Sequence, residues 1–390
     1  MKTILVLISF LFFTNSYADF KFIKKKSTVT KPQIIFPIKK TDIKSCSSKM
    51  LISSDMVFKP IKTLDAPKGY GLDDRFDRVR QYFVKFNDPC SVGNLEACKK
   101  VKEILLVWAN SGGPKRKSNG DIWNDTLTLN LHINSPMLSG YSFALQQIEF
   151  LDEEKDLIES WFKKTVRRGE HLMYDKTYGS ETQAKGTPKR AHNHALSSAV
   201  SHMELGVILN NDKMFRLAFK NYEAAIKYQR KDGSLPIEVR RGGRAMFYQG
   251  RAMNALSVIA IIAENQGYDI WNYDYKGKNF HNLVKFFIDF TENNEIVFKY
   301  AKEMKAPGPA KDYKKQDLSW NRSSNWGWLY AYATRFPNHD NIKRIKEWSE
   351  KKSSLNDYQK SLIYHYENIG VRPFLDASWT VVEPNCHFLR

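Results

Sequence analysis

From Leu72 onward the sequence is a succession of segments with apolar residues at helical spacing, separated by short polar connections. Residues 72–86 show the pattern, because their apolar side chains recur at the i, i+3 and i+4 spacing of one helix face. Convincing strand patterns are few. The sequence therefore predicts an all-α fold of about ten or eleven helices.

Local signals place most of these helices. Asn211 or Asp212 is a suitable cap for one start, and Gly267 is a suitable terminator for another helix. No strict repeat period is present, so a regular solenoid is not expected. Helices in this number form either an α/α toroid with a cleft at one rim or an irregular bundle. We expect helices at 72–86, 95–109, 152–172, 191–209, 211–230, 244–267, 280–292, 323–335, 340–351 and 355–367.

Residues 1–18 have the pattern of a secretory signal peptide. Lys2 precedes an apolar run, and small residues lead to a cleavage site after Ala18. The run is too short to span a bilayer, and no later segment has the roughly 18 uninterrupted apolar residues of a membrane helix. The sequence therefore predicts an exported protein, periplasmic or secreted, without a membrane span.

Four cysteines remain, and an even number in an exported chain favours disulfides over free thiols. Cys90 and Cys98 close a short loop and are expected to pair with each other. This leaves Cys46 to pair with Cys386 near the end of the chain. No C-x-x-C pair is present, so the cysteine spacing does not indicate a zinc site.

The formal net charge of +19 attracts polyanions, namely nucleic acid, anionic lipid surfaces or acidic polysaccharides. Part of this charge lies in residues 19–65, which are expected to form a basic extended segment. A helical domain over residues 66–370 and a tail over residues 371–390 are expected to follow it. Because the chain is expected to be exported, nucleic acid is not an expected partner. The expected partner is an acidic polysaccharide, and the chain is expected to be a monomer.

Residues 232–252, DGSLPIEVRRGGRAMFYQGRA, contain an unusual group of cations around one tyrosine. Neighbouring cations favour the phenolate and lower the pKa of a tyrosine from about 10, which suits it to acid–base work. The alternative is a half-buried tyrosine on a solvated basic face. A helix that includes residues 241–251 would place on one face Arg241, Arg244, Tyr248 and Arg251.

Residues 191–209 are expected to form an amphipathic helix, and AHNHA at its start places Asn193 between His192 and His194. A metal site would need a third converging ligand, and in a helix the two histidine rings would point about 200° apart. An HNH nuclease would need a pair of strands, which this stretch lacks. We therefore expect no metal and interpret the stretch as part of a catalytic cleft.

The two stretches together resemble the alginate lyases of polysaccharide lyase family 5. The resemblance rests on Asn193-His194 and on DGSLP-x-E-x-x-RG-x-RA-x-x-Y at 232–248. APKGY at 66–70 and NWGWLYAYATRFP at 325–337 also resemble segments of the family. The resemblance implies an incomplete α/α toroid over roughly residues 65–350, with an Asn-His pair facing an Arg…Tyr pair across a cleft.

The resemblance also implies a reaction, β-elimination on a polyuronate without a cofactor. The C5 proton of a uronate is removed and O4 of the next sugar is expelled, once the carboxylate has been neutralised. Tyr248 would return a proton to O4, and either Tyr248 or His194 would abstract the C5 proton, depending on the stereochemistry. The implied catalytic residues are Asn193, His194, Arg241 and Tyr248, and the expected substrate-binding residues are His192, Arg244 and Arg251.

The chain departs from the family pattern at several positions. His192 stands where the family has Asn, Leu196-Ser197 where it has an aromatic pair, and Gln249-Gly250-Arg251 where it tends to have His-Asn-Phe. The substrate is therefore less defined than the reaction. Mannuronate-rich alginate is the first expectation and another polyuronate, such as glucuronan, is the alternative. A non-catalytic helical protein that binds polyanions is a further alternative.

Overall fold

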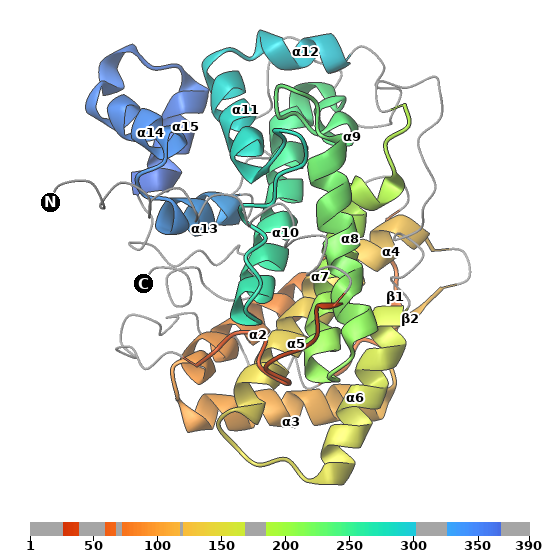
Figure 1. Cartoon of the computed structure of the whole chain (residues 1–390). Coiled ribbons are helices and arrows are strands. Elements are labelled where there is room, and N and C mark those ends of the chain that lie inside the picture. Colours follow the sequence, from red (N-terminus) through yellow and green to blue (C-terminus); the bar gives the residue numbers. More distant parts are fainter. Residues whose placement is uncertain are drawn as a thin grey trace, which may run out of the picture.

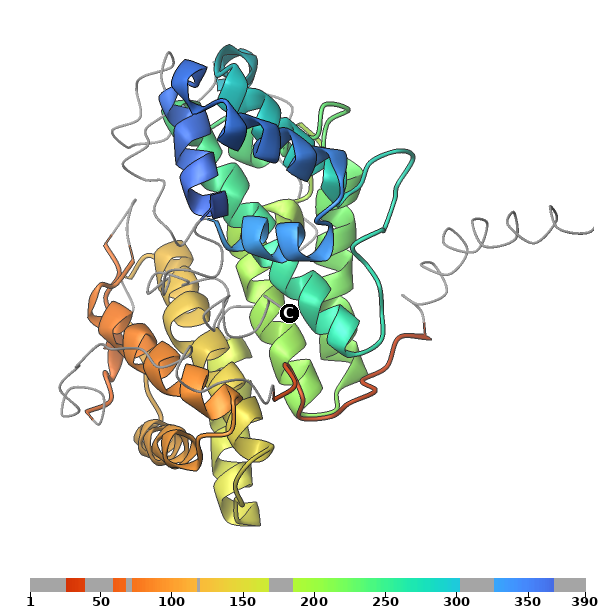
Figure 2. The same ribbon diagram turned by 90° about the vertical axis from the view of Figure 1, so that its left-hand side faces the viewer.

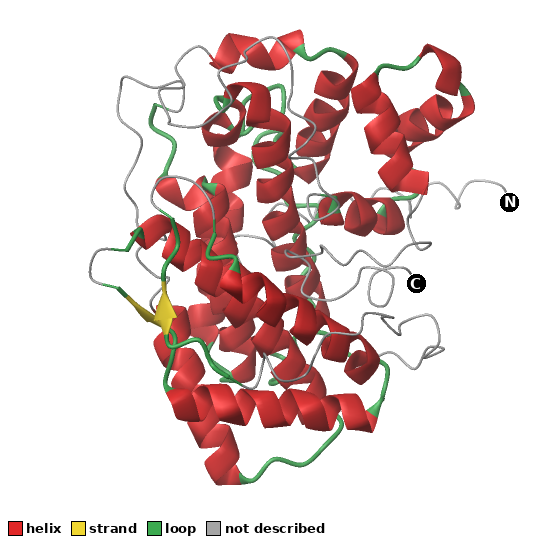
Figure 3. Cartoon of the chain, turned by 180° about the vertical axis from the view of Figure 1, so that it is seen from behind, coloured by secondary structure: helices red, strands yellow, loops and turns green. Residues whose placement is uncertain are grey.

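The computed structural model describes residues 26–38, 59–67, 72–117, 120–167, 185–301 and 326–367. Helices dominate this part of the chain, and its paired strands are limited to β1 (Thr63–Leu64) and β2 (Lys115–Arg116), which run parallel (Figure 3). The all-α prediction is confirmed. The helices are α2 (Arg75–Ser91), α3 (Leu95–Ser111), α4 (Ile122–Thr128), α5 (Ser135–Leu145), α6 (Asp152–Arg167), α7 (Asn193–Ile208), α8 (Asp212–Tyr228), α9 (Pro236–Val239), α10 (Ala245–Asn265), α11 (Phe280–Glu292), α12 (Glu295–Ala301), α13 (Gly327–Arg335), α14 (Asp340–Glu350) and α15 (Asp357–Glu367).

Helices α7, α8 and α10 occupy the middle of the fold (Figure 1). Helices α2, α3, α5 and α6 lie toward one end, and α11 to α15 lie toward the other (Figure 2). Helix α7 packs against α8, α10 and α5, so it joins the two ends. Helices α4, α5, α9 and α12 were not predicted. Three of them, α4, α9 and α12, are too short to show a periodic pattern, and α5 is buried along almost its whole length, so it has no polar stripe.

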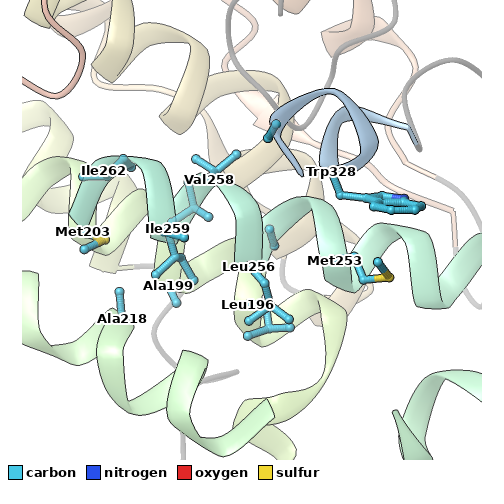
Figure 4. Close-up of a cluster of buried hydrophobic side chains, with 14 of the residues drawn as sticks. Leu196, Ala199, Met203, Ala218, Met253, Leu256, Val258, Ile259, Ile262 and Trp328 are labelled. Carbon is cyan, nitrogen blue, oxygen red and sulfur yellow. The ribbon is translucent and has the colours of Figure 1, made fainter. Parts of the chain in front are cut away.

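Helix α7 is buried on all sides, which corrects the prediction of an amphipathic helix. Every residue of α7 except His194 is buried. Its apolar side chains, among them Leu196 and Ala199, lie beside Leu256 and Ile259 of α10 (Figure 4). A helix covered by neighbours on every face needs no polar stripe, so its sequence shows little amphipathic pattern.

The predicted cap at Asn211 and the predicted terminator at Gly267 are confirmed in this central region. Asn211 caps α8 by accepting a hydrogen bond from Met214 N, and Gly267 follows α10 with a positive φ of 85°. The turn before α9 requires Gly233, which has a φ of 89° and packs against the backbone of α11. A Cβ at this position would lie 1.9 Å from the carbonyl oxygen of Asn282.

Residues 26–38 belong to the segment that was predicted to be a basic extension, and they lie against the helical body (red in Figure 1). The Gln266 side chain accepts hydrogen bonds from Thr30 N and Lys31 N at 3.0 and 2.8 Å. It also donates to the carbonyl oxygen of Ile34 at 2.9 Å. Phe36 is buried in the core. This part of the extension is therefore fixed to the end of α10.

The disulfide between Cys90 and Cys98 is confirmed and joins the end of α2 to the start of α3. The predicted pair of Cys46 and Cys386 lies outside the described residues, as does the predicted signal peptide. Among the helices of the described ranges, none has the length and apolar character needed to cross a membrane.

A row of buried polar side chains joins α7 to α5 and to the π-helical turn Leu129–Asn134 before it. Asn130 Nδ2 donates to Ser198 Oγ at 2.7 Å, and Ser139 Oγ donates to Glu204 Oε1 at 3.1 Å. Burial raises the pKa of Glu204 to about 8, although hydrogen bonds from Ser135 and Ser139 act in the opposite direction. Glu204 is therefore protonated in the folded protein at neutral pH.

We expect Glu204→Gln to stabilise the protein at alkaline pH. Between its usual pKa and about 8, folded Glu204 holds a proton that the unfolded chain releases, so wild-type stability falls as the pH rises through this window. Glutamine still accepts from Ser139 but does not titrate. Calorimetric melting temperatures should rise above wild type at alkaline pH and differ little near pH 5. Equal changes in melting temperature at both pH values would contradict the raised pKa of Glu204.

Candidate active site

His192 and His194 lie together at the start of α7. His192 has extended backbone angles, φ −77° and ψ 146°, and α7 begins only at Asn193. The two imidazole rings therefore stack, with centroids 4.7 Å apart and planes 28° from parallel. The prediction that they point about 200° apart is wrong, because it assumed that His192 is helical.

Asn193 is fixed by a buried carboxylate. Its backbone N donates to Glu238 Oε1 at 2.8 Å, and its side-chain Nδ2 donates to Glu238 Oε2 at 2.9 Å. Burial raises the pKa of Glu238, and the nearby Arg241 charge and the Asn193 hydrogen bonds oppose this shift. Glu238 lies on α9, within the DGSLP-x-E stretch, but the sequence analysis gave it no role. The sequence signal that could have drawn attention to Glu238 is its fixed place in that motif.

Arg241 links the histidine pair to Tyr248. Its Nη2 lies 3.3 Å from His192 Nε2, and its Cζ lies 4.6 Å from the centroid of the Tyr248 ring. Because a guanidinium only donates, Nε2 of His192 accepts in this contact. The structure thus brings together the side chains that the sequence analysis assigned to the two sides of a catalytic cleft.

The helix predicted to include residue 241 begins later, which corrects the local prediction. Gly242–Arg244 form a single 3-10 turn, and α10 starts at Ala245. Gly242 has a φ of 58°, a left-handed conformation that a helix excludes. Arg241 therefore reaches the site from a turn, whereas Tyr248 and Arg251 share a face of α10. Arg244, a predicted substrate-binding residue, is only 1% exposed.

Positive charge in the site comes from arginine. Burial lowers the pKa of His194 to about 3, and the charges of Arg251 and Arg241 add to this effect. Burial also holds the pKa of His192 well below its usual value, with His194 and Arg241 contributing. Burial lowers the pKa of Arg251 to about 10, so it remains charged at neutral pH. With pKa values lowered in this way, both histidines are neutral at pH 7.

Tyr248 is only 5% exposed in this structure. Most of its side chain is therefore covered by the rest of the protein. The ring lies against Arg241 and, edge to face, against Phe247 at 5.0 Å. Within the described ranges no three His, Cys, Asp or Glu side chains are grouped so as to hold a metal ion.

Comparisons with known proteins point to one family. The alginate lyase family model matches residues 116–298. An alginate lyase from Cobetia marina is 31% identical over 122 residues, 30% of this chain and 29% of that protein. One from Pseudomonas syringae pv. tomato is 28% identical over 141 residues, 34% of this chain and 35% of that protein. The matched segments thus span about a third of these relatives' own length.

The likeness in fold extends further along the chain. Alginate lyase A1-III from Sphingomonas species A1 superimposes with a TM-score of 0.64, at 17% identity, over 82% of this chain and 92% of its own. A histidine-to-alanine variant of alginate lyase A1-III, complexed with tetrasaccharide, gives 0.61 at 16% identity, over the same fractions of the two chains. This likeness confirms the predicted α/α toroid.

Proposed function

Because residues 116–298 match the alginate lyase family model, we propose that the protein is a polysaccharide lyase that cleaves a polyuronate by β-elimination. The observation that carries the proposal is the convergence of Asn193, His194, Arg241 and Tyr248 from α7 and from the turn and first helical residues that follow α9. The preferred substrate is mannuronate-rich alginate, and the protein acts after export to the periplasm or the medium.

The first step is neutralisation of the uronate carboxylate at the subsite where the proton leaves. Arg241 and Arg251 supply positive charge, and the amide of Asn193 supplies a donor whose position Glu238 fixes. Charge that develops on the carboxylate as the C5 proton departs is stabilised by these prearranged groups. His194 is neutral and contributes a hydrogen bond rather than a charge.

The second step moves a proton from C5 to O4. A base takes the C5 proton, the released electron pair forms the C4=C5 double bond as the C4–O4 bond breaks, and an acid protonates O4. Tyr248 is the acid in this proposal. The low pKa of His194 makes it a weak base near neutral pH, which favours Tyr248 as the base as well.

A non-catalytic protein that binds polyanions is the second candidate, and the burial of Tyr248 is the observation in its favour. The two candidates predict different results with the same reagents. Purified protein is mixed with polymannuronate, polyguluronate and polyglucuronate, and the ultraviolet absorbance of the conjugated 4,5-unsaturated product is followed. We expect absorbance growth, fastest on polymannuronate. Binding without absorbance growth on every polymer would favour the second candidate.

A further inference from the structure

Trp123 differs from the other tryptophans in the described residues, because its side chain is 39% exposed whereas the others are buried. It lies in the first turn of α4, and Asp121 caps this helix. The Asp121 side chain accepts hydrogen bonds from Trp123 N at 2.9 Å and from Asn124 N at 3.1 Å. The backbone that carries the indole is therefore held in place.

The indole lies beside the candidate active site. Its ring centroid is 6.3 Å from that of His192 and 6.1 Å from that of His194, with interplanar angles of 86° and 66°. His192 and Tyr248 are 5% exposed, so Trp123 is the more accessible aromatic surface in this group. An exposed large aromatic beside a polar cluster is a common mark of a binding surface.

We propose that Trp123 is a stacking platform for a pyranose ring of the substrate, in the subsite next to the uronate that reacts. This inference rests on the proposed function. A uronate residue has a carboxylate for arginine and, on its ring face, C–H groups that suit an aromatic plane. The two residues that stand in place of the family's aromatic pair, Leu196 and Ser197, are 0% and 2% exposed and offer no such plane.

The test separates binding from turnover. In Trp123→Ala we expect about a tenfold rise in KM on the polyuronate that the wild type cleaves best, with kcat changed much less. Trp123→Phe retains an aromatic plane and should recover most of the affinity. Calorimetric titration with short oligouronates, in a Tyr248→Phe background that does not consume them, should show the same loss of affinity.

Ile122→Ala is the matched control, because Ile122 precedes Trp123 on α4 and is 45% exposed. Its KM should stay at the wild-type value, and circular dichroism should show that every variant is folded. If the parent protein cleaves normally and Trp123→Ala keeps the wild-type KM, Trp123 is not a stacking platform. The proposed lyase function would be unaffected by that result. A fall in kcat alone would also overturn the platform. A parent protein that neither binds nor cleaves any polyuronate would overturn both proposals.

Discussion

Replacing Tyr248 with phenylalanine is expected to reduce the elimination rate about 10⁴-fold, the upper end of what acid–base groups contribute. The substitution keeps the ring, its contact with Arg241 and the helix that carries it, but removes the one proton that the residue can move. A residue that serves as both base and acid has no substitute within the site. Single-turnover rates on the preferred polyuronate measure the loss directly.

Binding and folding are the controls for this variant. Oligouronate affinity should stay close to wild type, because the carboxylate contacts come from Arg241, Arg251 and Asn193. Tyr248 is buried, so loss of its hydroxyl is expected to lower the free energy of unfolding by about 0.5–1.5 kcal/mol, which does not unfold a domain of this size. Near-normal elimination on every polymer that the wild type cleaves would remove Tyr248 from the mechanism.

Much of the fold was accessible from the sequence because its signals are local. Caps and glycines at element ends, such as Asn211 and Gly267, are read within a few residues of the feature they define. The Cys90–Cys98 disulfide was also predictable, because its two cysteines are close in the sequence. The choice between a toroid and a bundle depends on how helices far apart in the sequence pack, and only the resemblance to a family decided it.

The side chains that the sequence analysis named lie together in the structure, but their geometry was not predicted. Two errors in the predicted geometry each come from the backbone conformation of one residue. The extended angles of His192 bring the two imidazoles into a stack, and the left-handed Gly242 delays the start of α10. The charge state of His194 depends on burial by elements that are distant in sequence. Glu238 was missed because its place in the motif marks a carboxylate but does not show which amide that carboxylate binds.

Arg241→Lys is expected to lower kcat/KM about 10²-fold, although the positive charge is retained. The guanidinium of Arg241 does two things at once, since its plane lies over the Tyr248 ring and its Nη2 donates to His192. A lysine ammonium is a point donor without a planar fork, so it cannot hold a carboxylate in two hydrogen bonds and keep both of these contacts. The substrate would therefore bind in a less defined position.

Arg240→Lys is the matched control, because it makes the same chemical change one residue earlier in the chain. The charge of Arg240 acts on His192 and Glu238, so this variant changes the type of cation and keeps the general field of the site. We expect its kcat/KM to stay close to wild type, and both variants to melt at similar temperatures. If Arg241→Lys also turned over normally, Arg241 would be one cation among many, and the bidentate geometry would have no part in orienting the uronate.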